Sequence, residues 1–407
     1  MIKTVFRPEA SDKIQAISSK SEIHRLLICA ALSDKKTEIV CENINEDIMA
    51  TTKCLKALGA EIEYDNGIFT VLPVKSVPEN PVLFCNESGS TLRFLLPICA
   101  RLCENATFET KGRLASRPLS PLKEELEKGN TRIKTENSNI LVSGKNKDTH
   151  FEIAGNVSSQ FISGLMFMLT FTGGEIIITN SIESRPYIEM TIEALRLFGC
   201  NVSFSKGIIT VEKKCPLTSP EKIKGFGDWS NAAFFIAAGV TGQKKITVTG
   251  LKSDSFQGDR KIIEILKRFG AEIEISDDEV TAFPSVLSAT DIDARDIPDL
   301  VPVLSVVATR AKGKTKISGC ERLRLKESDR IEAVKNMISS LGGKIEVIND
   351  EIIIEGCSLS GGVVNSENDH RIAMSAAVAA FFTTSPVTIN DAQAVNKSYP
   401  SFWDELK

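Results

Sequence analysis

Ten lysine and arginine residues stand where predicted helices begin, next to serine, asparagine and other polar residues. A helix start presents unpaired N–H groups and the positive end of the helix dipole, and both favour anions. Arginine adds two-pronged binding of carboxylate and phosphate groups. One such residue alone is ordinarily a solvated surface charge or half of an ion pair, but ten at repeat-equivalent positions predict a site for a small polyanion. They are Lys20, Arg25, Arg93, Arg113, Arg117, Arg185, Lys326, Arg330, Arg371 and Lys397.

Motifs for several other chemistries do not occur. Gly313-Lys314-Thr315 resembles the end of a phosphate-binding P-loop, but Ala308 stands where that motif requires its first glycine. No Gly-x-Gly-x-x-Gly follows a predicted strand, and neither His-Glu-x-x-His nor Gly-x-Ser-x-Gly is found. The chain has 3 histidines, and only His370 belongs to a dense polar cluster. These observations disfavour nucleotide-binding, zinc-protease and serine-hydrolase functions.

The composition is that of a globular protein. Hydrophobic residues make up 42% and charged residues 25%, and 49 Lys and Arg against 53 Asp and Glu give a net charge of −4. This balance predicts no nucleic-acid partner and no membrane partner, and the longest apolar runs are shorter than the ~18 residues of a membrane span. The 10 cysteines form no Cys-x-x-Cys motif, and the N-terminus has a strand pattern instead of a signal peptide. We therefore expect a cytoplasmic protein.

Two series of predicted helices recur at a nearly constant spacing along the chain. The first series is amphipathic, and each helix ends in a glycine that leads into a strand, a position that favours positive φ. These evenly spaced glycines are Gly59, Gly129, Gly199, Gly270 and Gly342. The second series is apolar on nearly every face, which is typical of buried helices. Its members start near Lys20, Gly89, Ser159, Trp229, Asp299 and His370.

This pattern predicts six βαβαββ repeats, and therefore an α/β fold of two similar domains, each with three repeats around its buried helices. Chance spacing in an ordinary α/β chain is the alternative, which four matching spacings in the first series and five in the second disfavour. Six complete repeats would need a chain slightly longer than the 407 residues present. The last repeat ends in a predicted surface helix at 397–407 and lacks its closing hairpin. We expect the N-terminal strand Ile2–Phe6 to fill part of this gap, which places both chain ends in one domain.

Nine polar motifs follow one another from residue 20 to residue 400. They are Lys20-Ser21-x-x-x-Arg25, Glu87-Ser88-Gly89-Ser90-Thr91-Leu92-Arg93, Gly112-Arg113-x-x-x-Arg117-Pro118, Ser158-Ser159-Gln160, Ser184-Arg185-Pro186-Tyr187, Ile297-Pro298-Asp299, Lys326-Glu327-Ser328-Asp329-Arg330, Asp369-His370-Arg371 and Asn396-Lys397-Ser398-Tyr399-Pro400. Each motif alone is weak, but the combination is specific. Together they resemble the 5-enolpyruvylshikimate-3-phosphate (EPSP) synthases of the enolpyruvyl transferase family.

The resemblance implies the inside-out α/β fold of that family. Residues 1–18 would join 227–407 in domain I, residues 19–226 would form domain II, and the active site would lie in the cleft between them. We expect a monomer, and nothing in the implied scheme needs a metal or an organic cofactor.

The implied reaction transfers the enolpyruvyl (carboxyvinyl) group of phosphoenolpyruvate to the 5-hydroxyl of shikimate 3-phosphate and releases phosphate. It belongs to the shikimate pathway of aromatic amino acid biosynthesis, and the family is the target of glyphosate. Asp299 matches the base for the 5-hydroxyl, Glu327 the group that exchanges the methylene proton, and Lys20 an acid–base residue that also binds anions. Asp299 as a helix cap and Glu327 as a partner of Arg330 are the structural alternatives.

The resemblance also implies two sets of binding residues. Those matching phosphoenolpyruvate contacts are Lys20, Gly89, Arg113, Gln160, Arg330, Arg371 and Lys397. Those matching shikimate 3-phosphate contacts are Lys20, Ser21, Arg25, Ser158, Ser159, Gln160, Ser184, Tyr187, Asp299 and Lys326. Two positions depart from the family pattern and receive no role. Glu87 begins a Glu-Ser-Gly-Ser segment where many members have Asn-Ala-Gly-Thr, and Arg322 stands where some members place an asparagine contact.

Two other functions compete with this interpretation. The enolpyruvyl transferase that acts on UDP-N-acetylglucosamine shares the fold, but it typically has a cysteine in the loop that here runs from Gly112 to Pro118 without one. A non-catalytic anion-binding protein would need the arginines alone. Asp299 and Glu327 would be costly in an anion site that performed no acid–base chemistry.

Overall fold

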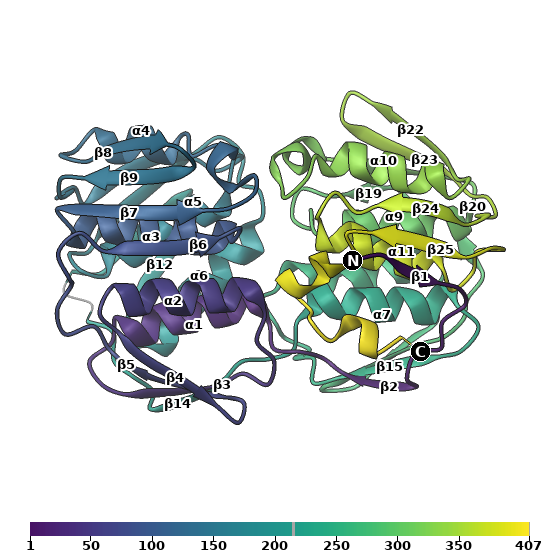
Figure 1. The fold of residues 1–407 in the computed structure, drawn as a ribbon, viewed down its shortest axis with the longest axis horizontal. Helices are drawn as coiled ribbons and strands as arrows, with labels where there is room; N and C mark the ends of the chain where they lie inside the picture. The colour runs from purple at the N-terminus through teal and green to yellow at the C-terminus, as the bar shows by residue number, and fades with distance from the viewer. Residues whose placement is uncertain (214–215, 407) are drawn as a thin grey trace. The chain divides into compact units, whose positions relative to one another are not determined.

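The structure, a computed structural model, describes residues 1–213 and 216–406. The chain forms two compact units. Unit 1 contains Met1–Ser19 and the segment that begins at Phe226, and unit 2 is Lys20–Gly225. Figure 1 shows the chain entering unit 2 after its first strands and returning to unit 1 afterwards. No helix of the described residues is long and apolar enough to cross a membrane.

Three buried helices form the centre of unit 2: α1 (Lys20–Ala31), α3 (Gly89–Leu102) and α5 (Ser159–Leu169). Their apolar residues make one continuous core, as the pattern predicts. Helices α3 and α5 meet at Gly164, where an added Cβ would clash with the carbonyl oxygen of Arg93. Pro97 has no N–H to donate to that carbonyl within α3. The glycine therefore allows α5 to approach α3 at the turn that the proline weakens.

Three four-stranded sheets surround these helices. Across each sheet the first strand is parallel to the second, and the third is antiparallel to both of its neighbours. Surface helices α2 (Glu46–Ala57), α4 (Leu122–Glu127) and α6 (Arg185–Leu197) precede the hairpins. In sheet order, the strands are β14 (Lys222–Lys224), β3 (Thr37–Val40), β5 (Ile68–Leu72) and β4 (Glu61–Asp65); β6 (Val82–Asn86), β7 (Asn105–Thr110), β9 (Asn139–Ser143) and β8 (Arg132–Glu136); β10 (His150–Ala154), β11 (Gly174–Thr179), β13 (Ile208–Val211) and β12 (Val202–Ser205).

Unit 1 repeats this plan around α7 (Trp229–Thr241), α9 (Val301–Arg310) and α11 (His370–Ala379). Its surface helices are α8 (Ile262–Arg268) and α10 (Arg330–Ser340). In sheet order, the strands are β16 (Ile273–Ile275), β17 (Glu279–Ala282), β15 (Ile246–Thr249) and β2 (Lys13–Gln15); β19 (Ile292–Asp293), β21 (Lys314–Ser318), β23 (Glu351–Glu355) and β22 (Lys344–Ile348); β24 (Gly362–Asn365), β25 (Val387–Asn390) and β1 (Lys3–Val5); and the short pair β18 (Leu287–Ser288) and β20 (Ala311–Lys312). The predicted α/β fold of βαβαββ repeats around buried helices is confirmed.

The strands that precede α1 and α7 are exchanged between the two units. β2 precedes α1 in the chain, but it pairs with β15 in unit 1. β14 precedes α7, but it pairs with β3 in unit 2. Each exchanged strand takes the parallel first position of the sheet that it joins. Sequence periodicity does not distinguish this arrangement from two self-contained sheets, because the strand patterns are the same in both.

The N-terminal strand closes the last sheet, as expected from the shortened last repeat. β1 pairs antiparallel with β25, in the position that a closing hairpin strand has in the other sheets. Figure 1 shows the N-terminus and β1 beside β25. An isolated bridge joins Ala10 to Leu406, so the two ends of the chain lie in one unit.

The ends of the surface helices follow the prediction except in the second and the last repeats. Gly59, Gly199, Gly270 and Gly342 have the expected positive φ, whereas Gly129, the loosest match, does not. The predicted helix at 397–407 is wrong. Two short 3-10 turns, η4 (Ala392–Lys397) and η5 (Phe402–Asp404), occupy this region. Pro400 explains the difference, because a proline disfavours helical backbone at the residue before it.

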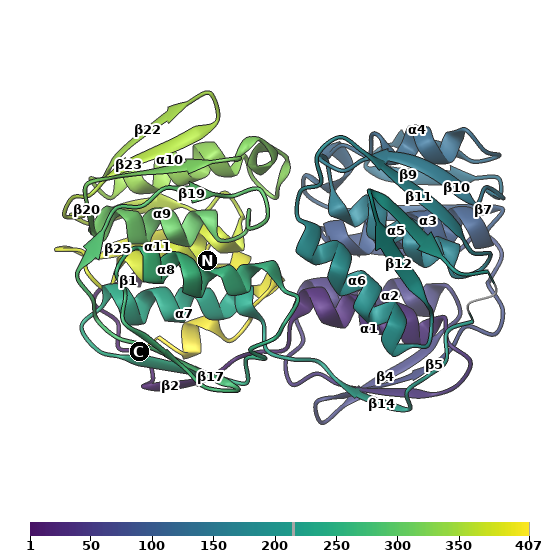
Figure 2. The same ribbon diagram turned by 180° about the vertical axis from the view of Figure 1, so that it is seen from behind.

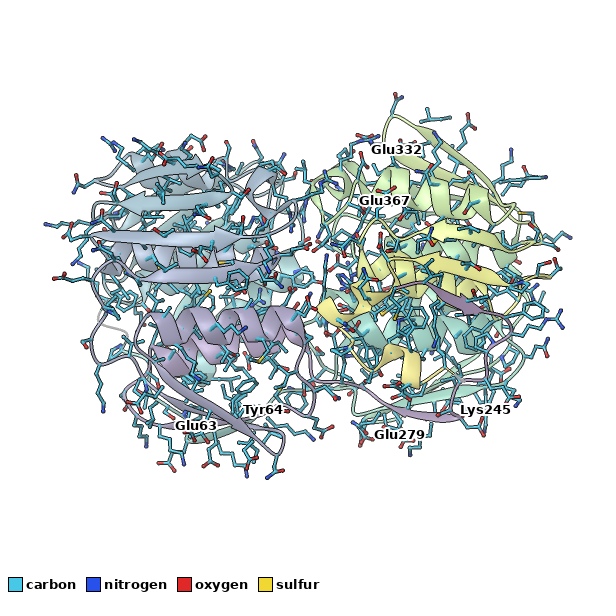
Figure 3. The ribbon with its side chains drawn as sticks, viewed as in Figure 1. Glu63, Tyr64, Lys245, Glu279, Glu332 and Glu367 are labelled. Carbon is cyan, nitrogen blue, oxygen red and sulfur yellow. The ribbon has the colours of Figure 1, made fainter. Side chains whose placement is uncertain are left out.

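The sheets keep their charged side chains on the outside. In β4, Glu61 and Glu63 are exposed while Ile62 between them is buried, which is the alternation of a half-buried strand. Figure 3 shows Glu63 on β4 and Glu279 on β17 at the outer surface of their units. Glu279 forms an ion pair with Lys13 of β2. The polar residues at the starts of the central helices are therefore a separate group, away from these outer charges.

Candidate active site

Asp299 is the centre of an ion-pair cluster in unit 1. It lies in the turn just before α9, whose cap residue is Leu300. Its Oδ1 is 2.5 Å from Nη1 of Arg330 and 3.5 Å from Nζ of Lys326, and its Oδ2 is 3.3 Å from Nη2 of Arg371. Three cations thus face one carboxylate. The alternative of a simple helix cap does not describe Asp299, because its oxygens bind side chains instead of backbone N–H groups.

Arg330 connects Asp299 to two further carboxylates. It is the first residue of α10, where Asp329 caps the helix, and its side chain is 1% exposed. Its Nη2 donates to Glu327 at 2.7 Å and its Nε to Asp369 at 2.7 Å. Glu327 is therefore a partner of Arg330, the structural alternative, and it also belongs to the same cluster as Asp299.

Asp369 is a member of this cluster to which the sequence assigned no role. It caps α11 by accepting a bond from the backbone N–H of Arg371, and it is fully buried. Ser328 also donates to it, at 3.1 Å. An aspartate directly before a buried helix is an ordinary cap signal. Only the three-dimensional structure shows that the same carboxylate also holds Arg330.

Arg371 and Lys397 extend the cluster. Arg371 follows His370 at the start of α11, and besides Asp299 it donates to the carbonyl of Ser230 at 3.3 Å. Lys397 ends η4, and its ammonium donates to the carbonyl of Asn368 at 2.7 Å, in the loop that contains Glu367 (Figure 3). The structure therefore places Arg371 against Asp299 and Lys397 beside the start of α11.

Mutual charge sets the protonation of this cluster. Burial alone would raise the pKa of Asp299, but Arg371, Lys326 and Arg330 together hold it well below its ordinary value. Burial would lower the pKa of Arg330, yet Asp369, Glu327 and Asp299 hold it well above its ordinary value. For Lys326 burial dominates and lowers the pKa to about 8, although Asp299 opposes the shift. Asp299 is thus ionised at neutral pH, and Lys326 loses its proton at a lower pH than an ordinary lysine.

A second layer of polar residues supports Arg371 from the start of α7. Asp228 caps this helix, and Gln257 donates both to Asp228 and to the hydroxyl of Ser230. Ser230 in turn donates to the buried carboxylate of Asp259. Burial and the nearby Asp299 raise the pKa of Asp259 to about 6. The sequence assigned no role to Gln257 or Asp259, which lie at the start of the 3-10 helix η2 (Gly258–Lys261), in a segment without a recognised motif.

In unit 2, Lys20 and Arg25 have different surroundings. Lys20 begins α1 and pairs with Asp47 in the first turn of α2 at 2.9 Å, a partner that the sequence did not predict. Arg25 is buried against the ring of Phe94. It donates to Thr191 Oγ1 at 2.8 Å and to the carbonyls of Ser21 and Tyr187. The bonds to Thr191 and Tyr187 therefore hold α1 to α6, which Figure 2 shows beside each other, and the bond to Ser21 stays within α1.

The start of α3 is surrounded by basic and amide groups. Ser88 caps the helix, and a Cβ on Gly89 would come within 2.7 Å of a guanidinium nitrogen of Arg93 and 2.8 Å of one of Arg117. Gln160, at the start of α5, donates to the hydroxyl of Ser90 at 2.9 Å. The missing Cβ of Gly89 thus lets two guanidinium groups approach the start of α3, where a helix N-terminus already favours anions.

The other predicted residues of unit 2 lie at helix starts or in a loop. Ser158 caps α5, and Ser159 is the buried first residue of that helix. Ser184 precedes α6 with φ of 53°, a left-handed conformation that is uncommon outside glycine, and Tyr187 lies in the first turn of α6. Arg113 is exposed in the loop after β7. The carboxylate of Glu87, in the turn between β6 and α3, packs against Gly112 of this loop.

Comparison with known proteins shows the family to which this chain belongs. The family model for EPSP synthase (3-phosphoshikimate 1-carboxyvinyltransferase) matches residues 8–406. The chain belongs to the EPSP synthase family. Curated relatives named 3-phosphoshikimate 1-carboxyvinyltransferase include that of Clostridium novyi, 41% identical over 98% of this chain and 95% of the relative. That of Clostridium acetobutylicum is 40% identical over 96% and 92%, and that of Clostridioides difficile 38% identical over 99% and 96%.

Solved structures of this fold family match nearly the whole chain. The EPSP synthase of Acinetobacter baumannii superimposes with a TM-score of 0.81 at 23% identity, covering 99% of this chain and 97% of that one. The enolpyruvyl transferase NikO of Streptomyces tendae gives 0.78 at 17% identity, covering 100% and 96%. These two structures establish the enolpyruvyl transferase fold, and the family assignment comes from the sequence relatives.

Proposed function

We propose that this EPSP synthase family member transfers the enolpyruvyl group of phosphoenolpyruvate to the 5-hydroxyl of shikimate 3-phosphate, yielding 5-enolpyruvylshikimate 3-phosphate and phosphate. The family match over residues 8–406 is the observation that carries this proposal. The charge cluster around Asp299 supports it, because it combines carboxylates for proton transfer with cations for binding anions.

The cluster also suggests how substrate binding activates the base. Without substrate, Asp299 is paired with Arg330 and Arg371, so its pKa is low and it is a weak base. A substrate carboxylate that binds these arginines competes with Asp299 for them. The pKa of Asp299 then rises, and the carboxylate becomes a stronger proton acceptor when phosphoenolpyruvate is in place.

The reaction then proceeds in two steps. Asp299 takes the proton of the 5-hydroxyl of shikimate 3-phosphate as the hydroxyl oxygen bonds to C2 of phosphoenolpyruvate. Glu327 or Lys20 gives a proton to C3, and a tetrahedral intermediate forms. In the second step C3 loses a proton and the C2–O bond to phosphate breaks, which restores the double bond. Each acid–base group of this kind contributes roughly 10²- to 10⁴-fold.

Residues of unit 2 complete the proposed site. Gly89, Arg113 and Gln160, with Lys20, would bind phosphoenolpyruvate alongside Arg330, Arg371 and Lys397. The shikimate 3-phosphate set would be Lys20, Ser21, Arg25, Ser158, Ser159, Gln160, Ser184, Tyr187, Asp299 and Lys326. The helix starts at Ser88 and Ser158 support this assignment, because their remaining N–H groups and positive dipole ends favour phosphate. Substrate binding would therefore draw on both units.

We further propose that the protein acts as a monomer in the cytoplasm. Eight of the nine described cysteines are buried, as expected of thiols that act as small hydrophobic core residues in a reducing compartment.

The proposal is tested by phosphate release from phosphoenolpyruvate with the full chain. We expect release that depends on shikimate 3-phosphate and does not occur with UDP-N-acetylglucosamine. Release with UDP-N-acetylglucosamine alone would assign the other enolpyruvyl transferase activity. Binding of both proposed substrates in calorimetry without any phosphate release would identify an anion-binding protein instead.

A further inference from the structure

A chain of four side-chain hydrogen-bonding groups crosses the core of unit 2. Nδ1 of His24 in α1 lies 2.6 Å from Oγ1 of Thr51 in α2. That oxygen lies 2.7 Å from Oγ1 of Thr91 in α3, which lies 2.7 Å from Oγ of the cap residue Ser88. All four residues are 0% exposed. Core positions between helices are ordinarily apolar, so this polar chain requires an explanation.

Counting hydrogens gives the chain a direction. A hydroxyl carries one hydrogen and donates once. Thr91 donates to Ser88, so it accepts from Thr51, and Thr51 accepts from His24. His24 therefore carries its hydrogen on Nδ1. Its Nε2 is buried without a hydrogen-bond partner among the described residues, which fits a nitrogen that carries no hydrogen. Burial, with Lys20 and Arg25 nearby, lowers the pKa of His24 well below its ordinary value and keeps it neutral.

The chain lies about one turn inside the starts of α1 and α2 and at the very start of α3. His24 follows Lys20 by four residues in α1, and Thr51 follows Asp47 by four residues in α2. Residues four apart share one face of a helix. The ion pair of Lys20 with Asp47 is thus stacked above the bond of His24 with Thr51. The third helix, α3, begins at Gly89, next to the last member of the chain.

We propose that His24, Thr51, Thr91 and Ser88 form a positioning chain that fixes the starts of α1, α2 and α3 relative to one another for phosphoenolpyruvate binding. The inference rests on the proposed function. None of the four residues needs to touch substrate. Their role is to hold Lys20 and Gly89 at a fixed separation, with the guanidinium groups of Arg93 and Arg117 beside Gly89.

The kinetic test compares Thr91→Val, which removes the hydroxyl at nearly constant volume, with Thr91→Ser, which keeps it. Thr52→Val is the matched control, because Thr52 is also buried and its hydroxyl donates only to the carbonyl of Ile48 in its own helix. We expect Thr91→Val to raise KM for phosphoenolpyruvate about tenfold, since ångström-scale misplacement of binding groups is costly. KM for shikimate 3-phosphate should change less than about twofold, and Thr91→Ser and Thr52→Val should resemble the wild type in both constants.

Three outcomes would overturn the proposal: unchanged KM for phosphoenolpyruvate in Thr91→Val, an equal rise in both constants, or the same change in Thr52→Val. If Thr91→Val does not fold, the pair Thr51→Val and Thr51→Ser provides the same comparison. Absence of phosphate release by the wild-type protein would instead refute the proposed function.

A spectroscopic measurement tests the chain without relying on activity. The protein has 3 histidines, so 15N NMR of the imidazole nitrogens can assign His24 by comparison with His24→Gln. We expect a protonated Nδ1 and a bare Nε2 that do not titrate near neutral pH. Thr51→Val should change this signature, and Thr52→Val should not. The opposite tautomer, or equal effects of the two variants, would contradict the chain.

Discussion

The two units are built from the same repeat but cap their central helices with different residues. In unit 2, serines cap α3 and α5, whereas in unit 1 aspartates cap α7 and α11. A neutral cap leaves the positive end of the helix available to an anion. An acidic cap adds negative charge that a cation can balance, and Asp369 does pair with Arg330. One fold thus supplies a half whose helix starts favour anions and a half rich in paired charges.

The polar networks behind the helix starts differ in the same way. The network of unit 2 contains hydroxyls and a neutral histidine, while that of unit 1 contains three carboxylates around Arg330. Neutral networks hold a fixed geometry without titrating near neutral pH. Charged networks shift the pKa values of their members and can exchange protons. We therefore propose that unit 2 serves mainly rigid binding and unit 1 mainly proton transfer.

The largest expected effect comes from removing the buried arginine of each unit. Arg330→Met leaves three carboxylates without their shared cation and should lower the free energy of unfolding by about 3–5 kcal/mol. Arg25→Met leaves only two carbonyls and a hydroxyl, and should cost about 1–3 kcal/mol. Chemical denaturation measures both. Equal losses would mean that the charge difference between the units has no energetic consequence.

An acidic cap introduced into unit 2 tests the role of the neutral caps. Ser158→Asp should change the free energy of unfolding by less than about 0.5 kcal/mol, because aspartate and serine cap helices about equally well. Its negative charge should nevertheless raise KM for shikimate 3-phosphate about tenfold through repulsion of the phosphate. Ser158→Asn, a neutral cap of similar size, is the control and should have a smaller effect. An unchanged KM in Ser158→Asp would remove Ser158 from the proposed phosphate-binding set.

The pH dependence of the reaction should reflect the charged network of unit 1. Lys326 has a pKa of about 8, so above that pH it loses the charge that attracts a substrate anion, and kcat/KM should fall. In Lys326→Arg the decline should move to higher pH, because arginine stays charged. The free energy of unfolding should depend on pH in the opposite sense and rise where kcat/KM falls. Between about 8 and the ordinary lysine pKa the unfolded chain holds more protons, so stability rises with pH. If the fall of kcat/KM at high pH is unchanged in Lys326→Arg, Lys326 is not the group that causes it.

The repeat and its helix starts could be predicted because they depend on local rules. Apolar periodicity located the six central helices, and four of the five helix-ending glycines have the expected φ. Asp47 and Asp369 were not assigned because a carboxylate in a first turn or a cap has a sufficient local explanation. Thr51 and Thr91 look like ordinary helix residues, and their connection depends on how α2 and α3 pack. The exchange of β2 and β14 depends on long-range pairing that periodicity does not encode.

The most direct test of this account is the rate of phosphate release by Asp299→Asn. This variant keeps the size of the side chain but removes the base, so kcat should fall about 10²- to 10⁴-fold. Substrate binding should be no weaker than in the wild type, because asparagine competes less for Arg330 and Arg371. Folding should be checked by circular dichroism. A kcat near that of the wild type would contradict the assignment of Asp299 as the base and, with it, of unit 1 as the half that transfers protons.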